Sequence, residues 1–240
     1  MEQIYEQKSV IVPGLCGAEG ALALEEVFRV FQDLAACHAQ ALGCGIYDLA
    51  AKNLFWLTVK TGIDVVRLPK MAEAVTLRTW PEAPGKMRCF RSYQILDGSG
   101  AVCVSGKTEW AVTNLETKQL APMEGVYPAE LTFEAGTARG SIARIPEGDM
   151  EDYGSYTVRS TDIDVGGHMN NAAYPRALLG SLSNAEQRAM NIRSMDVIFR
   201  APCFEGEKLT LSRRSGGEGL DLRMAGERGT VLLARIGGTI

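Results

Sequence analysis

Histidine is scarce in this sequence, and its cysteines are not arranged as metal ligands. The chain has only two histidines, and none of its six cysteines forms a Cys-x-x-Cys pair. Since these residue types provide most zinc ligands, we expect no metal site and no other cofactor. We interpret the cysteines as reduced thiols of a cytoplasmic protein; they are Cys16, Cys37, Cys44, Cys89, Cys103 and Cys203.

Long apolar runs and a surplus of positive charge are also lacking. No apolar run approaches the roughly 20 residues that span a bilayer. The opening residues, MEQIYEQKSV, do not show the basic and then apolar order of a signal peptide. The formal net charge is −4, which argues against a protein that coats nucleic acid. We therefore expect no membrane and no nucleic-acid partner.

The 240 residues include 46% hydrophobic and 22% charged side chains, an ordinary globular composition. Within them one pattern occurs twice. RLPKMAEAVTL (67–77) and RAPCFEGEKLTL (200–211) share Arg, Pro, Glu, Thr and Leu in the same order, with one residue inserted in the second copy. An apolar run precedes each copy, and a hairpin signal follows each, at 95–106 and 223–235. This repetition indicates an internal duplication.

Each half also contains one main candidate helix. Residues 22–42 carry an acidic first turn and a wide apolar face at positions 27, 28, 30, 31, 34, 35 and 37. Gly43 or Gly45 can end that helix. Residues 171–182 are the candidate in the second half. Asn170 or Asn171 can cap it, and Pro175 is tolerated only in its first turn.

The expected fold class is therefore α+β. Each half reads as a short strand, a central helix and several antiparallel strands, which predicts a sheet wrapped around a helix. We expect an N-terminal domain over 1–125 and a C-terminal domain over 150–240. The weakly hydrophobic segment 126–149, with its prolines and glycines, is the expected linker.

The stretch Asp162–Tyr174, DIDVGGHMNNAAY, concentrates polar residues around His168, at the expected start of the second helix. It resembles the signature D-x-N-x-H-V-N-N-x-x-Y of acyl-acyl-carrier-protein (acyl-ACP) thioesterases. Residues 32–43 and 55–81 resemble that family's first helix and the strands after it, so the resemblance covers roughly residues 5 to 235.

The resemblance implies two tandem hotdog folds and a bacterial-type enzyme that hydrolyses fatty acyl-ACP to free fatty acid and carrier protein in fatty acid biosynthesis. Two positions depart from the family pattern. Gly166 stands where the family has a catalytic Asn, and Pro202 stands where it often has Glu, although Cys203 is kept. Glu205 is the nearby carboxylate that could replace the missing one.

Thioester hydrolysis needs a proton-handling group and donors for the developing oxyanion. We expect Asp164 and His168 to be catalytic, since an imidazole can act as base or donor near neutrality. Gly166 and Gly167 are expected to bring backbone N–H groups close to the substrate. Asn170 and Asn171 are expected to cap the helix and position the loop.

Cys203 has two interpretations at this stage. It is a nucleophile activated by His168, or it is a small buried side chain. By resemblance the first half forms the acyl-chain tunnel, and Phe55, Trp56 and His38 are our candidates for its lining. The acidic carrier protein would need a basic surface, for which several side chains are available: Arg88, Arg91, Lys107, Arg176, Arg193 and Arg200.

Three alternatives remain open. The chain could hydrolyse acyl-CoA, it could be a hotdog hydratase or dehydratase, or it could bind acyl groups without cleaving them. The His-x-Asn-Asn-x-x-Tyr element favours a thioesterase over a hydratase. Gly166 and Pro202 keep the non-catalytic alternative open, because each replaces a polar group of the family pattern. Two hotdog units in one chain can make a functional monomer, while exposed sheet edges leave a homodimer open.

Overall fold

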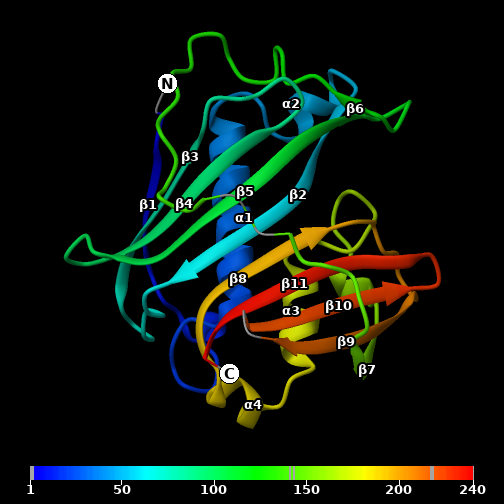
Figure 1. The fold of residues 1–240 in the computed structure, drawn as a ribbon. Helices are drawn as coiled ribbons and strands as arrows, with labels where there is room; N and C mark the ends of the chain where they lie inside the picture. The colour runs from blue at the N-terminus through cyan, green and yellow to red at the C-terminus, as the bar shows by residue number, and fades with distance from the viewer. Residues whose placement is uncertain (1–2, 141, 143, 217–218, 240) are drawn as a thin grey trace. The chain divides into compact units, whose positions relative to one another are not determined.

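The computed structural model describes residues 3–140, 142, 144–216 and 219–239. The chain divides into two compact units, Met1–Gly140 and Ser141–Ile240. Both units combine helices with one antiparallel sheet (Figure 1), which confirms the expected α+β class. In the described residues, no helix combines the length and apolar character needed to cross a membrane.

The first unit places its strands in the order β1-β3-β4-β5-β2, with β6 paired to β5. Every pairing is antiparallel. Its elements in chain order are β1 (Tyr5–Val10), the 3₁₀ turn η1 (Pro13–Leu15), α1 (Leu24–Ala41), α2 (Ile46–Ala50), β2 (Leu54–Val65), β3 (Ala74–Pro81), β4 (Cys89–Asp97), β5 (Val102–Asn114) and β6 (Leu120–Ala121).

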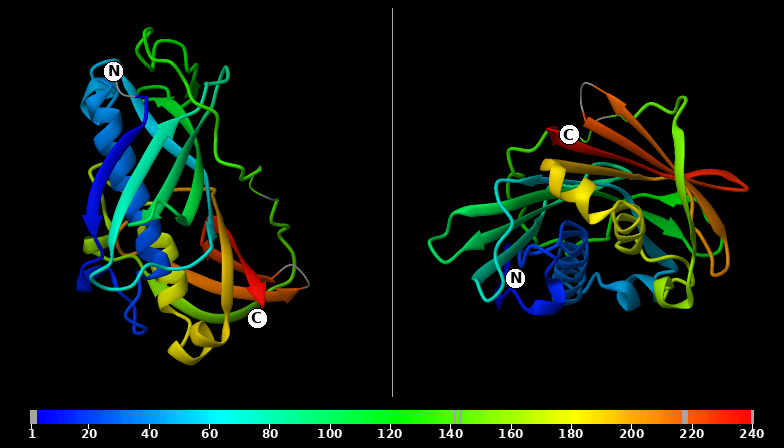
Figure 2. Two further views of the ribbon diagram at one scale, coloured as in Figure 1. Left: turned by 90° about the vertical axis from the view of Figure 1, so that its left-hand side faces the viewer. Right: turned by 90° about the horizontal axis from the view of Figure 1, so that it is seen from below.

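The second unit repeats this plan in the order β7-β9-β10-β11-β8. Its elements are β7 (Glu151–Thr157), the 3₁₀ turn η2 (Ser160–Asp162), α3 (Ala173–Gly180), α4 (Asn184–Ala189), β8 (Asn191–Phe199), β9 (Lys208–Gly216), β10 (Gly219–Gly226) and β11 (Gly229–Thr239). The views of Figure 2 show α1 along one face of the first sheet and α3 along one face of the second. The shared strand order confirms the duplication.

The long helix α1 forms where the periodicity predicts it. Glu25 and Glu26 lie in its first turn, where a carboxylate is favoured by the helix dipole. Gly43, at φ +69°, follows its end. One position differs from the expected apolar face: Cys37 is exposed, and His38 is buried instead. The register explains this, because residue 38 lies four positions after the buried Leu34 and continues its row.

The contact between α1 and its sheet depends on a glycine in β5. Phe31 of α1 stacks on Tyr93 of β4, with ring centroids 4.6 Å apart. A Cβ atom at Gly106 would lie 2.5 Å from Cε2 of Phe31. The helix can approach β5 this closely only because that residue has no side chain.

The duplication extends to the hydrogen bonds of one turn in each unit. Segments 16–22 and 163–169 are each closed by an isolated β-bridge between their end residues. In each, the second residue donates its N–H to the carbonyl of the sixth: Gly17 to Ala21 at 2.9 Å, and Asp164 to His168 at 3.0 Å. The fifth residue is a glycine at positive φ in both, Gly20 at +68° and Gly167 at +75°.

The structural register corrects part of the sequence repeat. The N–H groups of Arg67 and Ala201 each donate to the strand that closes the following hairpin, so Arg67 corresponds to Ala201 rather than to Arg200. Glu73 and Glu207 are equivalent, because the carbonyl of each accepts from the residue after the unit's first strand, Ile11 or Val158. In this register residues 67–77 align with 201–211 without an inserted residue.

Two short helices were not expected from the sequence. Asp48 accepts from the N–H of Gly45 and stabilises the start of α2. Helix α4 begins with a capping box, in which Ser183 Oγ accepts from the N–H of Glu186 and the Glu186 carboxylate accepts from the N–H of Ser183. The Ser-Asn-Ala-Glu run is a visible signal of that box, and it was overlooked.

The described residues of 126–149 contain no helix or strand. The beginning of this segment nevertheless packs against the first unit. Val126 and Leu131 are buried in its apolar clusters. The indole N–H of Trp80 donates to the carbonyl of Ala135 at 2.9 Å.

Gly106→Ala should lower the free energy of unfolding by about 1–3 kcal/mol, because the new methyl group would press on Phe31. Gly98→Ala is the control, since a Cβ at that exposed turn meets no atom within 4 Å. Urea denaturation followed by tryptophan fluorescence measures both. Equal stability of the two variants would show that α1 does not depend on this close approach.

Candidate functional site

The motif residues lie in a tight turn between η2 and α3. The N–H of Gly167 donates to the carbonyl of Asp164 at 3.0 Å, and Gly167 adopts the left-handed conformation that favours glycine. The turn thus holds the side chains of Asp164 and His168 close together. These side chains remain 23% and 29% exposed, respectively, so solvent or a substrate can reach them.

The surroundings of His168 define its tautomer. Its Nδ1 lies 3.4 Å from the carbonyl oxygen of Met169 and 3.9 Å from Oδ1 of Asp164. Both neighbours are acceptors, so Nδ1 carries the proton in the neutral ring, and Nε2 presents its lone pair. An imidazole held in this way can accept a proton at Nε2.

Gly166 lies directly against this pair. A Cβ atom there would be 3.0 Å from Oδ1 of Asp164 and 3.0 Å from Nε2 of His168. A side chain at position 166 would therefore require small shifts of both functional side chains. Glycine at position 166, where the family pattern has Asn, thus lets these two side chains lie close to the backbone.

The N–H groups of Gly166 and Gly167 are engaged within the turn. Gly166 donates to Oδ1 of Asp164 at 2.8 Å, and Gly167 donates to its backbone carbonyl. They hold the turn and the carboxylate instead of pointing to a substrate. In the described part of the chain, the N–H groups of Val165 and His168 form no hydrogen bond, so these are the open donors of the loop.

Asn170 acts just before the helix, and Asn171 follows it directly in the chain. The side-chain oxygen of Asn170 accepts from the N–H of Ala172 at 2.8 Å. Helix α3 starts at Ala173, and its N-cap residue is Ala172, so the prediction of an Asn170 or Asn171 N-cap was wrong. Asn170 closes the turn that delivers the chain into the helix. Pro175 lies in the first helical turn, as expected.

Tyr174, the last residue of the motif, ties the site to a second segment. Its hydroxyl accepts from the N–H of Cys203 at 3.1 Å and donates to the carbonyl of Ala201 at 3.4 Å. The carbonyl of Cys203 in turn accepts from the N–H of Met169 at 2.8 Å. Segment 201–203 therefore fixes the residue that follows His168.

Cys203 is itself fully buried, at 0% exposure. Burial raises the pKa of its thiol, which disfavours the nucleophilic thiolate. All six cysteines of the chain are free.

Asp162 and Tyr156 form part of the site's support that the sequence analysis missed. Oδ2 of Asp162 accepts from the Tyr156 hydroxyl at 2.7 Å and from the N–H of Arg159 at 2.8 Å. The backbone carbonyl of Asp162 accepts from the N–H of Asn170 at 2.7 Å. Burial and then Asp162 raise the pKa of Tyr156 to about 12, so it remains a donor at neutral pH. The sequence signal for this support is a second carboxylate in the motif stretch, two residues before Asp164.

The tunnel candidates lie in the first unit. Trp56, on β2, packs between two apolar clusters, and its indole N–H donates to the carbonyl of Cys44 at 2.9 Å. Phe55, its neighbour on the strand, is half-buried and points to the other face of the sheet. His38 is buried on α1, where it stacks against Tyr5.

Two further sequence candidates are the possible replacement for the family's Glu and a residue of the proposed basic surface. Glu205 is exposed, and no hydrogen bond or ion pair joins it to His168 within the described residues. Arg91 is only 3% exposed, so it cannot belong to a surface for a carrier protein, and that expectation was wrong.

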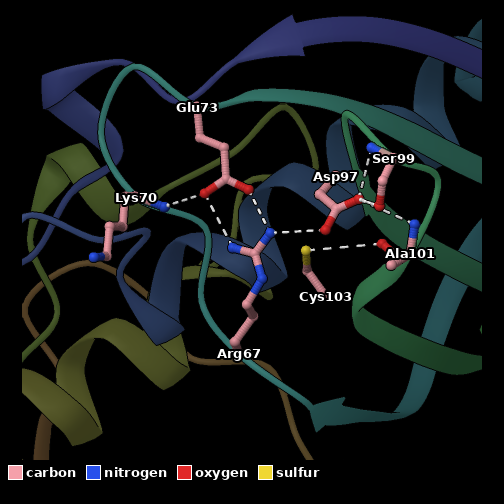
Figure 3. A network of polar contacts seen from close by, with 7 residues as sticks. All are labelled: Arg67, Lys70, Glu73, Asp97, Ser99, Ala101 and Cys103. Atoms are coloured by element: carbon pink, nitrogen blue, oxygen red, sulfur yellow. Dashed lines mark hydrogen bonds and ion pairs between the residues drawn. The ribbon is translucent and has the colours of Figure 1, made fainter.

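One group of potential cation ligands occurs in the described residues, at Glu73, Asp97 and Cys103. Figure 3 shows the Arg67 guanidinium between the two carboxylates. It donates to both oxygens of Glu73, at 2.5 and 3.0 Å, and to Asp97 at 3.0 Å. Since Arg67 already neutralises these carboxylates, we interpret the network as a structural brace.

Comparison with protein families decides where the chain belongs. Residues 2–131 match the acyl-ACP thioesterase N-terminal domain, and residues 147–230 match the C-terminal domain. The chain belongs to the acyl-ACP thioesterase family. The site loop of this thioesterase-family chain lies within the region that matches the C-terminal domain.

Similar proteins include plant members of the family. The oleoyl-acyl carrier protein thioesterase 1 of Arabidopsis thaliana is 23% identical over 83% of this chain and 60% of its own length. The palmitoyl-acyl carrier protein thioesterase of Cuphea hookeriana is 23% identical over 89% of this chain and 56% of its own. The chain thus spans about three fifths of the length of these curated relatives.

Solved structures show the same fold. An acyl-ACP thioesterase from Bacteroides thetaiotaomicron superposes with a TM-score of 0.92 at 20% identity, covering 99% of this chain and 98% of that one. The 12:0-ACP thioesterase of Umbellularia californica gives a TM-score of 0.84 at 18% identity, covering 100% of this chain and 98% of that one. The hotdog architecture implied by the motif is thereby confirmed.

Tyr174→Phe should destabilise the protein by about 1–3 kcal/mol, because the buried N–H of Cys203 would lose its acceptor. Tyr47→Phe, at a side chain that is 78% exposed, is the matched control and should change stability little. Urea denaturation measures the difference. If both variants unfold alike, the Tyr174 hydroxyl does not hold segment 201–203.

Proposed function

We propose that this protein hydrolyses fatty acyl-ACP thioesters to free fatty acid and carrier protein, in the cytoplasm. The observation that carries the proposal is the Asp164–His168 pair on a solvent-accessible turn of a chain whose two halves both match the family. The second unit supplies the chemistry in this proposal, and the first unit holds the acyl chain.

In the proposed reaction, Nε2 of His168 takes a proton from a water molecule as that water attacks the thioester carbonyl. Nδ1 keeps its proton toward Met169 and Asp164. The carboxylate of Asp164 stabilises the imidazolium that forms, and the N–H of Gly166 holds one of its oxygens in place. This is general base catalysis by an oriented histidine.

Attack gives a tetrahedral intermediate with a negative oxygen. The N–H groups of Val165 and His168 are the open donors of the loop, and we assign oxyanion stabilisation to them. The intermediate collapses when its carbon–sulfur bond breaks. The thiolate of the phosphopantetheine arm leaves and receives the proton held by His168, and the fatty acid is released.

The burial of Cys203 supports direct attack by water over an acyl-enzyme. A nucleophile must reach the carbonyl as a thiolate. The Cys203 thiol is enclosed and its pKa is raised, while its backbone groups hold Met169 and Tyr174. We therefore assign Cys203 a structural role.

Removing the acid–base pair tests the proposal. His168→Ala should lower kcat on acyl-ACP by about 10²–10⁴-fold, the usual contribution of a general base. Asp164→Asn should cost less than this, because it removes a group that acts through the histidine. Asp149→Asn, an exposed carboxylate outside the loop, is the control. Circular dichroism establishes that each variant is folded.

The substrate panel pairs each acyl group on carrier protein with the same group on coenzyme A. Faster turnover on the carrier is the expected result. Faster turnover on coenzyme A would instead identify an acyl-CoA thioesterase. Acyl binding without turnover by the wild-type protein would identify a non-catalytic acyl-binding protein.

Cys203→Ala should retain activity within about threefold and lose a small amount of stability, because only a buried sulfur atom is removed. Mass spectrometry of the wild-type enzyme, quenched during turnover, should show no acyl group on Cys203. An acylated Cys203, together with an inactive alanine variant, would replace the direct mechanism by a covalent one.

A further inference from the structure

The helix-facing side of the first sheet contains a row of buried polar side chains. Arg91 of β4 pairs across the sheet with Thr108 of β5, which pairs with Thr61 of β2. Cross-strand partners lie on the same face of a sheet. The hydroxyls of Thr61 and Thr108 are 3.1 Å apart, and Thr79 of β3 extends the row on the other side of Arg91. All four residues are at most 6% exposed.

Arg91 is the exceptional member of this row. It donates to Nδ1 of His38 on α1 at 3.0 Å and to the hydroxyl of Thr79 at 3.3 Å. Arginine can only donate, so Nδ1 of His38 is an acceptor and the imidazole is neutral. Among the described residues, no carboxylate forms an ion pair with Arg91. A guanidinium is therefore buried against neutral partners alone.

Four titratable groups on which the charge of Arg91 acts are neutral as well. They are thiols and phenols whose pKa values are raised, in each case chiefly by burial: Cys44, Cys89, Tyr93 and Tyr127. An uncompensated buried charge is costly. If Arg91 only anchored α1 to the sheet, its permanent charge would not be needed, because a neutral donor could make the same hydrogen bond.

Arg91 and His38 both lie between α1 and its sheet, in the unit that holds the acyl chain in our proposed function. A plain alkyl chain offers them nothing, since it has no acceptor. A guanidinium binds oxygen acceptors well, above all carboxylates.

Resting on the proposed function, we propose that Arg91, held by His38 and Thr79, binds an oxygen atom carried on the acyl chain of the substrate. The preferred substrates are then hydroxy, oxo or terminal carboxy acyl groups, and not plain alkyl groups of the same length. Arg91 is in this view a specificity-determining residue of the first unit.

The test compares acyl-ACP substrates of equal carbon number that carry an alkyl, a hydroxy, an oxo or a terminal carboxy chain. The wild-type protein should prefer at least one oxygenated chain by about tenfold or more in kcat/KM, as expected for a charge-assisted hydrogen bond. A preference for the hydroxy or oxo chain would identify a neutral oxygen as the ligand of Arg91. A preference for the terminal carboxy chain would identify an anionic one. Arg91→Met should abolish the preference.

Arg78→Met is the matched control. Arg78 precedes Thr79 on β3, so it lies on the opposite face of the sheet, where it pairs with Glu6. This variant should keep the wild-type ratio. Thr79→Val removes one partner of Arg91 without removing the charge, and it should reduce the ratio partly. It also serves as the test if Arg91→Met does not fold.

Calorimetric binding of the corresponding free acids separates this inference from the proposed function. Preferential binding of oxygenated acids by a protein that hydrolyses nothing would retain the role of Arg91 and reject the activity. Hydrolysis with equal rates on alkyl and oxygenated chains would retain the activity and overturn the role of Arg91. A preference that survives in Arg91→Met would overturn it too.

Discussion

The hydrogen bond from the N–H of Met169 to the carbonyl of Cys203 determines where the site stands. It joins the residue after His168 to a segment that Tyr174 holds from its other side. Because Tyr174 belongs to α3, hydrogen bonds link the helix, the loop and the connection between β8 and β9 into one closed ring of contacts. The spacing of the motif follows from these contacts, since its tyrosine must reach segment 201–203.

Within these linked segments, the proposed chemistry depends on short distances between the side chains of Asp164 and His168. Asp164 and His168 are four residues apart, and a Cβ atom at position 166 would lie only 3.0 Å from each of their side chains. In the first unit the same turn carries Gly17 and Ala21 at the positions of Asp164 and His168. The duplicated backbone is therefore common to both halves, whereas the functional side chains of the turn occur in one.

Much of the fold could be predicted because it follows from local patterns. The apolar period of α1, the Asp-Gly hairpin before β5 and the repeated strand run all depend on neighbouring residues. The motif could be predicted as a site for the same reason. What could not be predicted depends on contacts between distant segments, such as the bond from Tyr174 to Cys203. The burial of Arg91 is a further example, because a charged residue on an alternating strand resembles a surface residue until α1 covers it.

The two equivalent turns show that the backbone of the site does not depend on its reactive side chains. Segment 16–22 adopts the same hydrogen-bonded shape without a histidine or an aspartate. The acid–base pair thus consists of two side chains on a backbone turn, and that turn forms without them. The first unit already contains a second such turn, into which the pair could be grafted as one short segment.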